Sequence, residues 1–282
     1  MKEVTLNNGV KMPAIGFGVF QIPDHAACQK AVEEALEVGY RMIDTAASYM
    51  NEEAVGAAIK ASGLPREEVF VTTKLWVQDH GYENTLKAFD TSMEKLGLDY
   101  LDLYLIHKPY GDYYGAWRAM EQLYKEGRIK AIGVTSFPDD RMIDLILHNE
   151  VKPAVNQIET HPWMQQEASA KFLAEEGIVH EAWAPFAEGH HDIFRNPVIA
   201  SIGAKYGKTN GQVILRWLNQ RNVVVIPKSV HKERMMENLN IFDFTLTDED
   251  MALMSTLDRN EAAYDDRAVD IVKWICGTRI HD

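Results

Sequence analysis

The sequence has few cysteines, no long apolar run and no excess of positive charge. Its two cysteines, Cys28 and Cys276, lie outside any CxxC spacing, so we expect neither a disulfide framework nor a metal site. No stretch of about 18 apolar residues is present, and residues 1–9 lack the apolar core of a signal peptide. These absences predict a cytoplasmic protein that does not associate with a membrane.

The charge balance is acidic. Asp and Glu number 42 against 29 Lys and Arg, giving a formal net charge of -13. Because a phosphate backbone needs a basic surface, this balance argues against nucleic acid as a partner. A local cluster of Lys and Arg can still bind a small anion on an acidic protein. Composition gives no indication of the oligomeric state.

A dinucleotide-binding glycine loop is missing as well. The nearest segment, residues 16–20, reads Gly-Phe-Gly-Val-Phe and stops short of G-x-G-x-x-G. Doubly wound sheets that bind dinucleotides carry this loop between their first strand and first helix. Its absence argues against that architecture.

What the sequence does contain is an eightfold alternation of short apolar runs and amphipathic segments. Asn8-Gly9 predicts a type I′ hairpin turn between residues 4–6 and 10–12. The strands expected after this hairpin are 14–18, 41–45, 69–74, 101–107, 129–135, 153–159, 178–183 and 223–226. The last two are followed by helices expected near 212–218 and 231–239, and a capping box at Thr247 predicts another helix.

Nearly continuous apolar strands suit a parallel sheet that is covered on both faces. Eight repeats without a linker favour a closed barrel over two doubly wound halves. We therefore expect the α/β class: one domain, residues 1–282, forming a single (β/α)8 TIM barrel. An N-terminal β-hairpin would precede it, and extra helices would lie near the C-terminus.

Catalytic residues of such barrels lie at the C-terminal ends of the strands. Asp44 and Tyr49 follow the second expected strand, while Lys74 ends the third and His107 the fourth. A nearby ammonium lowers the pKa of a phenol, and a buried carboxylate keeps that ammonium charged. Such a set suits carbonyl reduction when a hydride donor lies opposite. Taken singly, Asp44, Lys74 and His107 could equally form a barrel salt bridge and a core hydrogen bond.

Six motifs resemble the aldo-keto reductase superfamily in the right order. Residues 39–46 with 49–52 resemble its signature, and the later motifs lie at 74–76, 105–109, 133–137, 156–159 and 226–229. The resemblance covers nearly the whole chain and is greatest to bacterial 2,5-diketo-gluconate reductase-like members. It implies an NADP-dependent enzyme that reduces an aldehyde or ketone to an alcohol, within the alcohol dehydrogenase and carbonyl reductase class. Tyr49 would be the proton donor, Asp44 and Lys74 would tune it, and His107 would orient the carbonyl.

The resemblance also implies that NADP(H) lies extended across the barrel mouth, without a glycine loop. Trp183 would stack on the nicotinamide, while Thr135, Ser136 and Gln157 would face its carboxamide. The pocket for the adenosine 2′-phosphate would comprise Lys228, Ser229, Val230, Arg234, Glu237 and Asn238. Two cations and a hydroxyl beside a helix N-terminus suit a phosphate dianion.

Two positions depart from the family pattern. Ser136 stands where the family has an amide side chain, so it lacks the amide's separate donor and acceptor, and it could instead cap the next helix. Lys108 stands where an aromatic residue is usual. If it faces the pocket it would attract carboxylated or phosphorylated substrates; it could also lie along the rim. The candidate pocket aromatics are Phe20, Trp76, Tyr110 and Trp117.

Two other functions stay open from the sequence. One is a catalytically quiet NADPH-binding regulatory barrel, although all four catalytic residues are present. The other is a TIM-barrel lyase or hydrolase, which would need a metal cluster or paired carboxylates at strand ends. The small carbonyl substrate itself is not identified. The tail from about 260 to 282 either folds over the mouth or packs on the barrel.

Overall fold

Eight parallel strands form the centre of the protein, whose computed structural model describes residues 2–282. Each strand pairs with the next one along the chain, so their hydrogen-bonded order is the order of the sequence. They are β3 (Phe17–Gly18), β4 (Met42–Asp44), β5 (Phe70–Leu75), β6 (Leu101–Ile106), β7 (Ile129–Thr135), β8 (Val155–Glu159), β9 (Val179–Trp183) and β10 (Val224–Val225).

The first and last of these strands meet, which closes the sheet. Ile15 forms a parallel bridge with Val225 just before β3 begins. The Gly16 N–H donates to the Val225 carbonyl at 2.8 Å, and the Val225 N–H donates to the Ala14 carbonyl at 3.3 Å. The predicted (β/α)8 barrel is therefore confirmed, and its residues alternate between the barrel interior and the surrounding helices.

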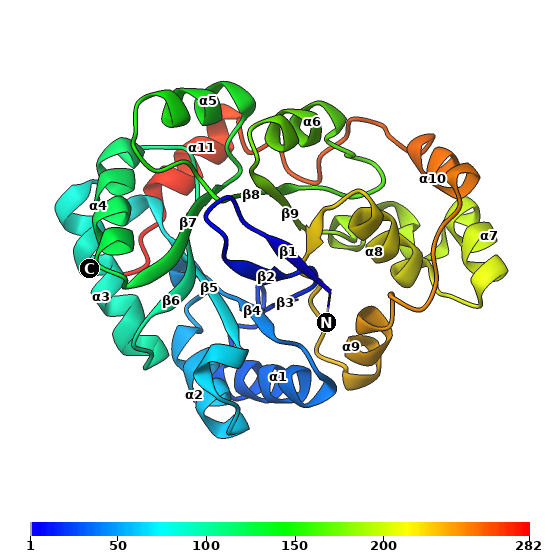
Figure 1. Ribbon diagram of the computed structural model, residues 1–282, viewed down its shortest axis with the longest axis horizontal. Helices are drawn as coiled ribbons and strands as arrows, with labels where there is room; N and C mark the ends of the chain where they lie inside the picture. The colour runs from blue at the N-terminus through cyan, green and yellow to red at the C-terminus, as the bar shows by residue number, and fades with distance from the viewer. Residues whose placement is uncertain (1) are drawn as a thin grey trace.

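An antiparallel hairpin of β1 (Glu3–Thr5) and β2 (Lys11–Pro13) lies across one end of the barrel (Figure 1). Leu6 and Met12 from this hairpin pack with residues of the barrel interior. The type I′ turn was a wrong prediction. Only Gly9 has a positive φ, and its N–H donates to the Leu6 carbonyl at 2.9 Å, so a longer loop closed by glycine connects the strands.

A ring of helices surrounds the strands (Figure 1). The helices that follow the strands are α1 (His25–Val38), α2 (Glu52–Ser62), α3 (Tyr82–Leu96), α4 (Tyr113–Lys125), α5 (Asp139–Leu147), α6 (Glu167–Glu175), α8 (Asn210–Gln220) and α9 (Lys232–Leu239). Short 3-10 segments are η1 (Ala47–Tyr49), η2 (Arg66–Glu68), η3 (Val77–Asp79) and η4 (Ala187–Arg195).

Three further helices lie outside this simple alternation. The sequence did not predict α7 (Pro197–Tyr206), although Asn196 caps it and Pro197 takes its first position, which is a readable start signal. The capping box at Thr247 is confirmed as the start of α10 (Asp248–Ser255). The last helix is α11 (Val269–Gly277), within the tail.

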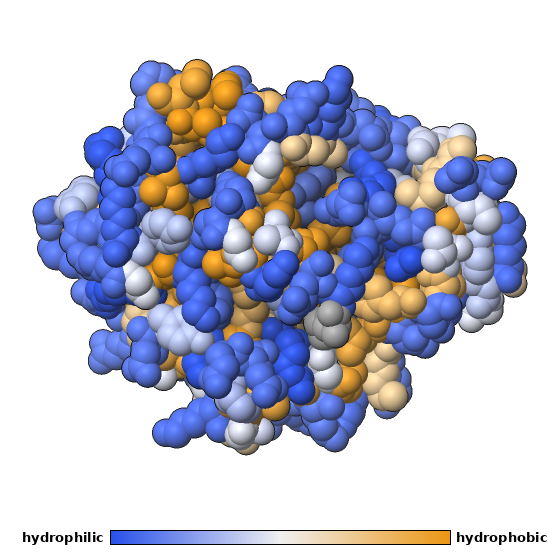
Figure 2. Space-filling view, viewed as in Figure 1, coloured by the Kyte–Doolittle hydropathy of each residue, from blue (hydrophilic) through white to orange (hydrophobic). Residues whose placement is uncertain are grey.

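The main core lies between the strands and the helices. Trp117 belongs to it: the side chain is buried on α4 and its indole N–H donates to the Val151 carbonyl at 3.2 Å. Its prediction as a pocket aromatic was therefore wrong, because it faces the core side of α4. On the face that carries the hairpin, hydrophobic residues form separate areas among hydrophilic ones (Figure 2). Among residues 2–282, no helix has both the length and the apolar character needed to span a bilayer.

Candidate active site

Three of the four predicted catalytic side chains meet directly around one ammonium. Lys74 Nζ, fully buried at the end of β5, donates to Asp44 Oδ1 at 2.5 Å and to the Thr45 carbonyl at 2.9 Å. It also lies 3.4 Å from the Tyr49 hydroxyl. His107 stands beside this group, with its ring centroid 5.7 Å from that of Tyr49. The ends of three consecutive parallel strands thus bring together residues that are 25 or more positions apart in the sequence.

The electrostatics favour a charged lysine and a neutral phenol. Burial lowers the pKa of Lys74, but Asp44 and Tyr49 raise it more, so the amine remains an ammonium. Burial raises the pKa of Tyr49 and outweighs the lowering by Lys74. The lowering that the sequence predicted is present but is the smaller effect. Tyr49 is half-buried, and because its pKa is raised, the phenol keeps its proton until charge develops on a partner.

His107 is held as a neutral imidazole. Burial first, and then the charges of Lys74 and Lys108, lower its pKa well below the usual range. Ser48 Oγ lies 3.2 Å from His107 Nδ1, and the Trp76 ring packs edge-on at 5.2 Å. If the Ser48 hydroxyl donates, the imidazole proton is on Nε2. Sequence reasoning missed Ser48, because a serine next to Tyr49 carries no motif signal of its own.

A short turn places Tyr49 at the mouth. Tyr49 ends the 3-10 segment η1, and Met50 follows with a left-handed φ of 57°. Asn51 stands at the N-cap position of α2, but its side chain makes no bond to the helix backbone. Its amide instead donates to the Val19 and Ile22 carbonyls and accepts from Thr45 Oγ1 at 2.8 Å. The side chain therefore ties the loops after β3 and β4 together.

The Lys108 ammonium is already paired at the barrel mouth. Its ammonium forms an ion pair with Asp266, donates to Ser136 Oγ at 3.2 Å and lies 5.7 Å from the Trp183 ring centroid. Asp266 belongs to the tail, and the Tyr110 hydroxyl donates to its carbonyl at 2.6 Å. The tail thus reaches the mouth and offsets the charge of Lys108.

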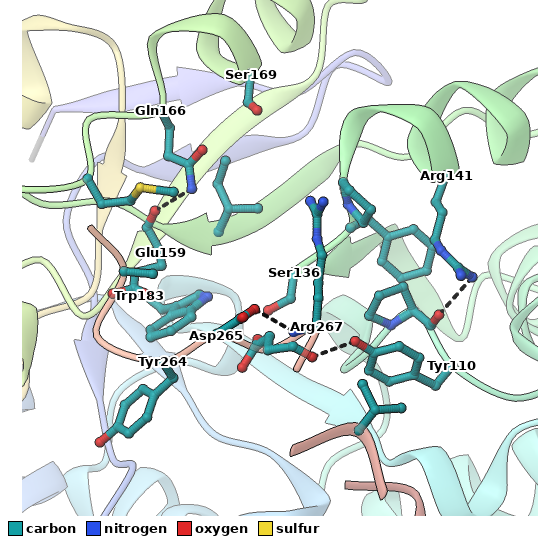
Figure 3. A pocket seen from close by; sticks show the side chains of 18 of the residues that line it. Tyr110, Ser136, Arg141, Glu159, Gln166, Ser169, Trp183, Tyr264, Asp265 and Arg267 are labelled. Atoms are coloured by element: carbon teal, nitrogen blue, oxygen red, sulfur yellow. Dashed lines mark hydrogen bonds between the residues drawn. The ribbon is translucent and has the colours of Figure 1, made fainter. Parts of the chain in front are cut away.

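Barrel and tail together enclose a cavity of about 650 Å³. Figure 3 shows Ser136 and Trp183 from the barrel, with Tyr264 and Arg267 from the tail, around this space. Trp76 is buried beside His107 and donates its indole N–H to the Thr278 carbonyl. Phe20 lies against Tyr49, with ring centroids 4.9 Å apart. Three predicted pocket aromatics, Phe20, Trp76 and Tyr110, therefore lie at the mouth.

The residues predicted to face the nicotinamide carboxamide lie in one row. Gln157 pairs in register with Thr135 on β7. Gln157 Nε2 donates to Asp44 Oδ2 at 3.0 Å and to Glu181 Oε2 at 2.9 Å. Thr135 Oγ1 donates to the His107 carbonyl at 2.5 Å.

Gln157 Oε1 has no hydrogen-bond donor among the described residues, so an acceptor is left for an amide ligand. Ser136 has a left-handed φ of 56° and does not cap α5, whose N-cap is Pro138. The capping role considered for Ser136 was wrong.

The residues predicted for the 2′-phosphate cluster around the start of α9. Within residues 2–282, Lys228 and Arg234 are exposed and in no ion pair. The helix begins after His231 without a side-chain cap, which leaves backbone N–H groups available to an anion. Ser229 is buried and turns its hydroxyl to the His231 backbone, whereas Val230 is exposed. Glu237 accepts from Thr209, and Asn238 is buried. The cationic part of the set fits a dianion.

The protein is a closed parallel barrel that carries a buried lysine, a carboxylate and a phenol at the C-terminal end of its strands. Polar groups at this end of the strands are typical of (β/α)8 enzymes. The family model described as Aldo/keto reductase family matches residues 14–259. The chain belongs to this family, as its motifs predicted.

Relatives and solved structures agree with this assignment. The glyoxal reductase of Bacillus subtilis (strain 168) is 48% identical over 259 residues, covering 92% of this chain and 93% of that protein. The methylglyoxal reductase DkgA of Escherichia coli (strain K12) is 43% identical over 261 residues, covering 92% and 94%. The crystal structure of a Bombyx mori aldo-keto reductase in complex with NADP is 35% identical, with a TM-score of 0.88, covering 94% of this chain and 95% of that one.

Proposed function

We propose that this protein is an NADPH-dependent oxidoreductase that reduces a small aldehyde or ketone to an alcohol, with Tyr49 as the proton donor. The observation that carries the proposal is the buried Lys74 ammonium between Asp44 and the Tyr49 hydroxyl. Family membership supports NADP(H) as the cofactor. The names of the glyoxal and methylglyoxal reductases support small dicarbonyl compounds as the substrate class. We propose further that the whole chain, residues 1–282, works as one domain.

In this mechanism the substrate carbonyl oxygen accepts hydrogen bonds from the Tyr49 hydroxyl and from His107 Nε2. The chemistry that NADPH would supply when bound is a hydride for the carbonyl carbon. As negative charge develops on the oxygen, Tyr49 transfers its proton, and Lys74 at 3.4 Å stabilises the resulting phenolate. Asp44 keeps Lys74 charged and in place. By donating to Nδ1, the Ser48 hydroxyl would leave the His107 proton on Nε2, where the mechanism needs it.

The cofactor would lie from the barrel mouth to the start of α9. Trp183 would stack on the nicotinamide, with Thr135, Ser136 and Gln157 near its carboxamide. Lys228, Ser229, Val230, Arg234, Glu237 and Asn238 would surround the adenosine 2′-phosphate. The free Gln157 oxygen and the uncapped start of α9 are the two features that support this path. Phe20, Trp76, Lys108 and Tyr110 would contact the substrate.

The test is NADPH consumption by the wild type and by Tyr49→Phe, with methylglyoxal, aromatic aldehydes and keto-sugar acids, repeated with NADH. Loss of a positioned acid is expected to lower kcat by about 10²–10⁴. Tyr124→Phe is the matched control, because Tyr124 lies beside the hairpin at the opposite end of the barrel. No turnover of any carbonyl by a wild type that binds NADPH tightly would refute the reductase and favour a quiet regulatory barrel.

A further inference from the structure

One buried carboxylate in the barrel interior has no part in the mechanism above. Glu181, on β9, is 0% exposed, and its Oε1 has no hydrogen-bond partner among the described residues. Burying a carboxyl group with an unsatisfied oxygen is costly, and an apolar side chain would fill the same space at lower cost. The position of this group beside the active site therefore calls for a functional account.

The single hydrogen bond of Glu181 leads to the site. Gln157 and Glu181 are directly paired between β8 and β9, and Gln157 Nε2 donates to Glu181 Oε2 at 2.9 Å. The second hydrogen of the same amide goes to Asp44 Oδ2, across the barrel, at 3.0 Å. An amide nitrogen has two hydrogens, so these two carboxyl groups use all of them. The Gln157 oxygen is consequently left without a donor inside the barrel.

Two anchors constrain an amide more than one does. With Asp44 alone, the Gln157 amide could pivot about a single hydrogen bond, so the direction of its oxygen would vary. With Glu181 as the second acceptor, both N–H vectors are fixed and so is the amide plane. The amide atom left without a partner is then always the acceptor oxygen, which matches the NH₂ group of a carboxamide.

We propose that Glu181 is a positioning residue, which holds the Gln157 amide so that its oxygen accepts from the nicotinamide carboxamide of the cofactor. This inference rests on the proposed function, since it requires NADP(H) at the barrel mouth. Glu181 acts only through Gln157 and does not touch the cofactor. Burial and the nearby Asp44 carboxylate raise the pKa of Glu181 to about 8, which is consistent with a group kept for its acceptor oxygen rather than for its charge.

Equilibrium binding of two nucleotides tests this role without turnover. The first is NADP⁺, and the second is its 3-acetylpyridine analogue, in which a methyl group replaces the carboxamide NH₂. Dissociation constants are measured by quenching of tryptophan fluorescence for the wild type, Glu181→Met and Glu181→Gln. Met fills the space without a strong acceptor, whereas Gln keeps an acceptor oxygen and removes the charge. Gln157→Leu gives the limit in which the proposed acceptor is absent.

Glu181→Met is expected to weaken NADP⁺ binding by about 3- to 10-fold, the value of one hydrogen bond, and to leave the analogue unchanged. Glu181→Gln should restore wild-type discrimination between the two nucleotides. When Gln157 is already replaced by Leu, Glu181→Met should cause no further weakening of NADP⁺ binding. Equal weakening of both nucleotides, or no weakening of either, would overturn the inference. A wild type that binds neither nucleotide would instead refute the proposed function itself, so the two failures are distinguishable.

Discussion

Stability should depend on pH through Glu181 in a direction opposite to that of an ordinary salt-bridged carboxylate. Burial, together with the Asp44 charge, raises the pKa of this group from 4.5 to about 8 in the folded protein. Between these two values the folded protein holds a proton that the unfolded chain releases. The free energy of unfolding therefore falls as pH rises through this window. The contribution of Glu181 protonation to stability is fully present only below pH 4.5 and is lost as pH rises through about 8.

The magnitude follows from the size of the shift. Each pH unit inside the window changes the free energy of unfolding by at most about 1.4 kcal/mol. Integrated with a folded pKa of about 8, wild type should lose about 2.5 kcal/mol between about pH 5.5 and 7.5 relative to Glu181→Gln. The neutral amide cannot titrate, so subtracting the two curves removes every ionisation that they share.

Urea denaturation followed by circular dichroism at five pH values measures this difference directly. Glu83→Gln, at an exposed position on α3, controls for the loss of one negative charge. A wild-type curve that runs parallel to that of Glu181→Gln would refute the reasoning, because it would mean that the buried carboxyl is ionised throughout.

Three further changes test the mouth, the phosphate set and the packing. Asp266→Asn should lower KM for a carboxylated substrate by about 2- to 5-fold and leave KM for a neutral substrate unchanged, because it frees the Lys108 charge. Lys108→Met should raise KM for the carboxylated substrate and also leave the neutral one unchanged. Equal effects on both substrates would contradict this reasoning. Lys228→Met should weaken NADPH binding by about 10-fold and NADH binding hardly at all, as measured by fluorescence titration. Gly56→Ala should lower Tm and reduce the free energy of unfolding by about 1–3 kcal/mol, since the new Cβ would lie 2.1 Å from the Leu96 carbonyl oxygen. The control in thermal unfolding is Gly211→Ala, whose new Cβ would make only ordinary contacts at 3.7 Å.

The barrel was predictable because its signals are local and repeated. Each strand is a short apolar run, and each helix that follows has its own helical periodicity. The eight strand–helix alternations can therefore be recognised even where the predicted ends of an element are wrong by a few residues. The helix α7 was not predicted despite a clear start at Asn196-Pro197, because a regular alternation of strands and helices has only one helix between the last two strands. The hairpin turn was misassigned because Asn8-Gly9 permits two positive φ angles but does not require them.

The site was predictable where strand ends define it and not where distant contacts do. Asp44, Lys74 and His107 end neighbouring strands, so the fold alone brings them together. Asn51 shows the opposite case: it stands at the N-cap position of α2, but bonds to residues about 30 positions earlier determine its role. Asp266 reaches Lys108 only through the path of the tail, which no motif specifies.

Charge at the mouth is balanced in pairs, and this bears on how selectivity can arise. Lys74 is offset by Asp44 inside the barrel, and Lys108 is offset by Asp266 at its rim. The first pair is fully buried and fixed by strands, whereas the second is partly exposed and depends on a segment that follows the last barrel helix. In the proposed mechanism, stabilisation of the Tyr49 phenolate would therefore depend on the rigid pair. If the substrate carries a carboxylate, our proposal is that Lys108 would attract it, and the carboxylate would have to replace Asp266 as the partner of Lys108.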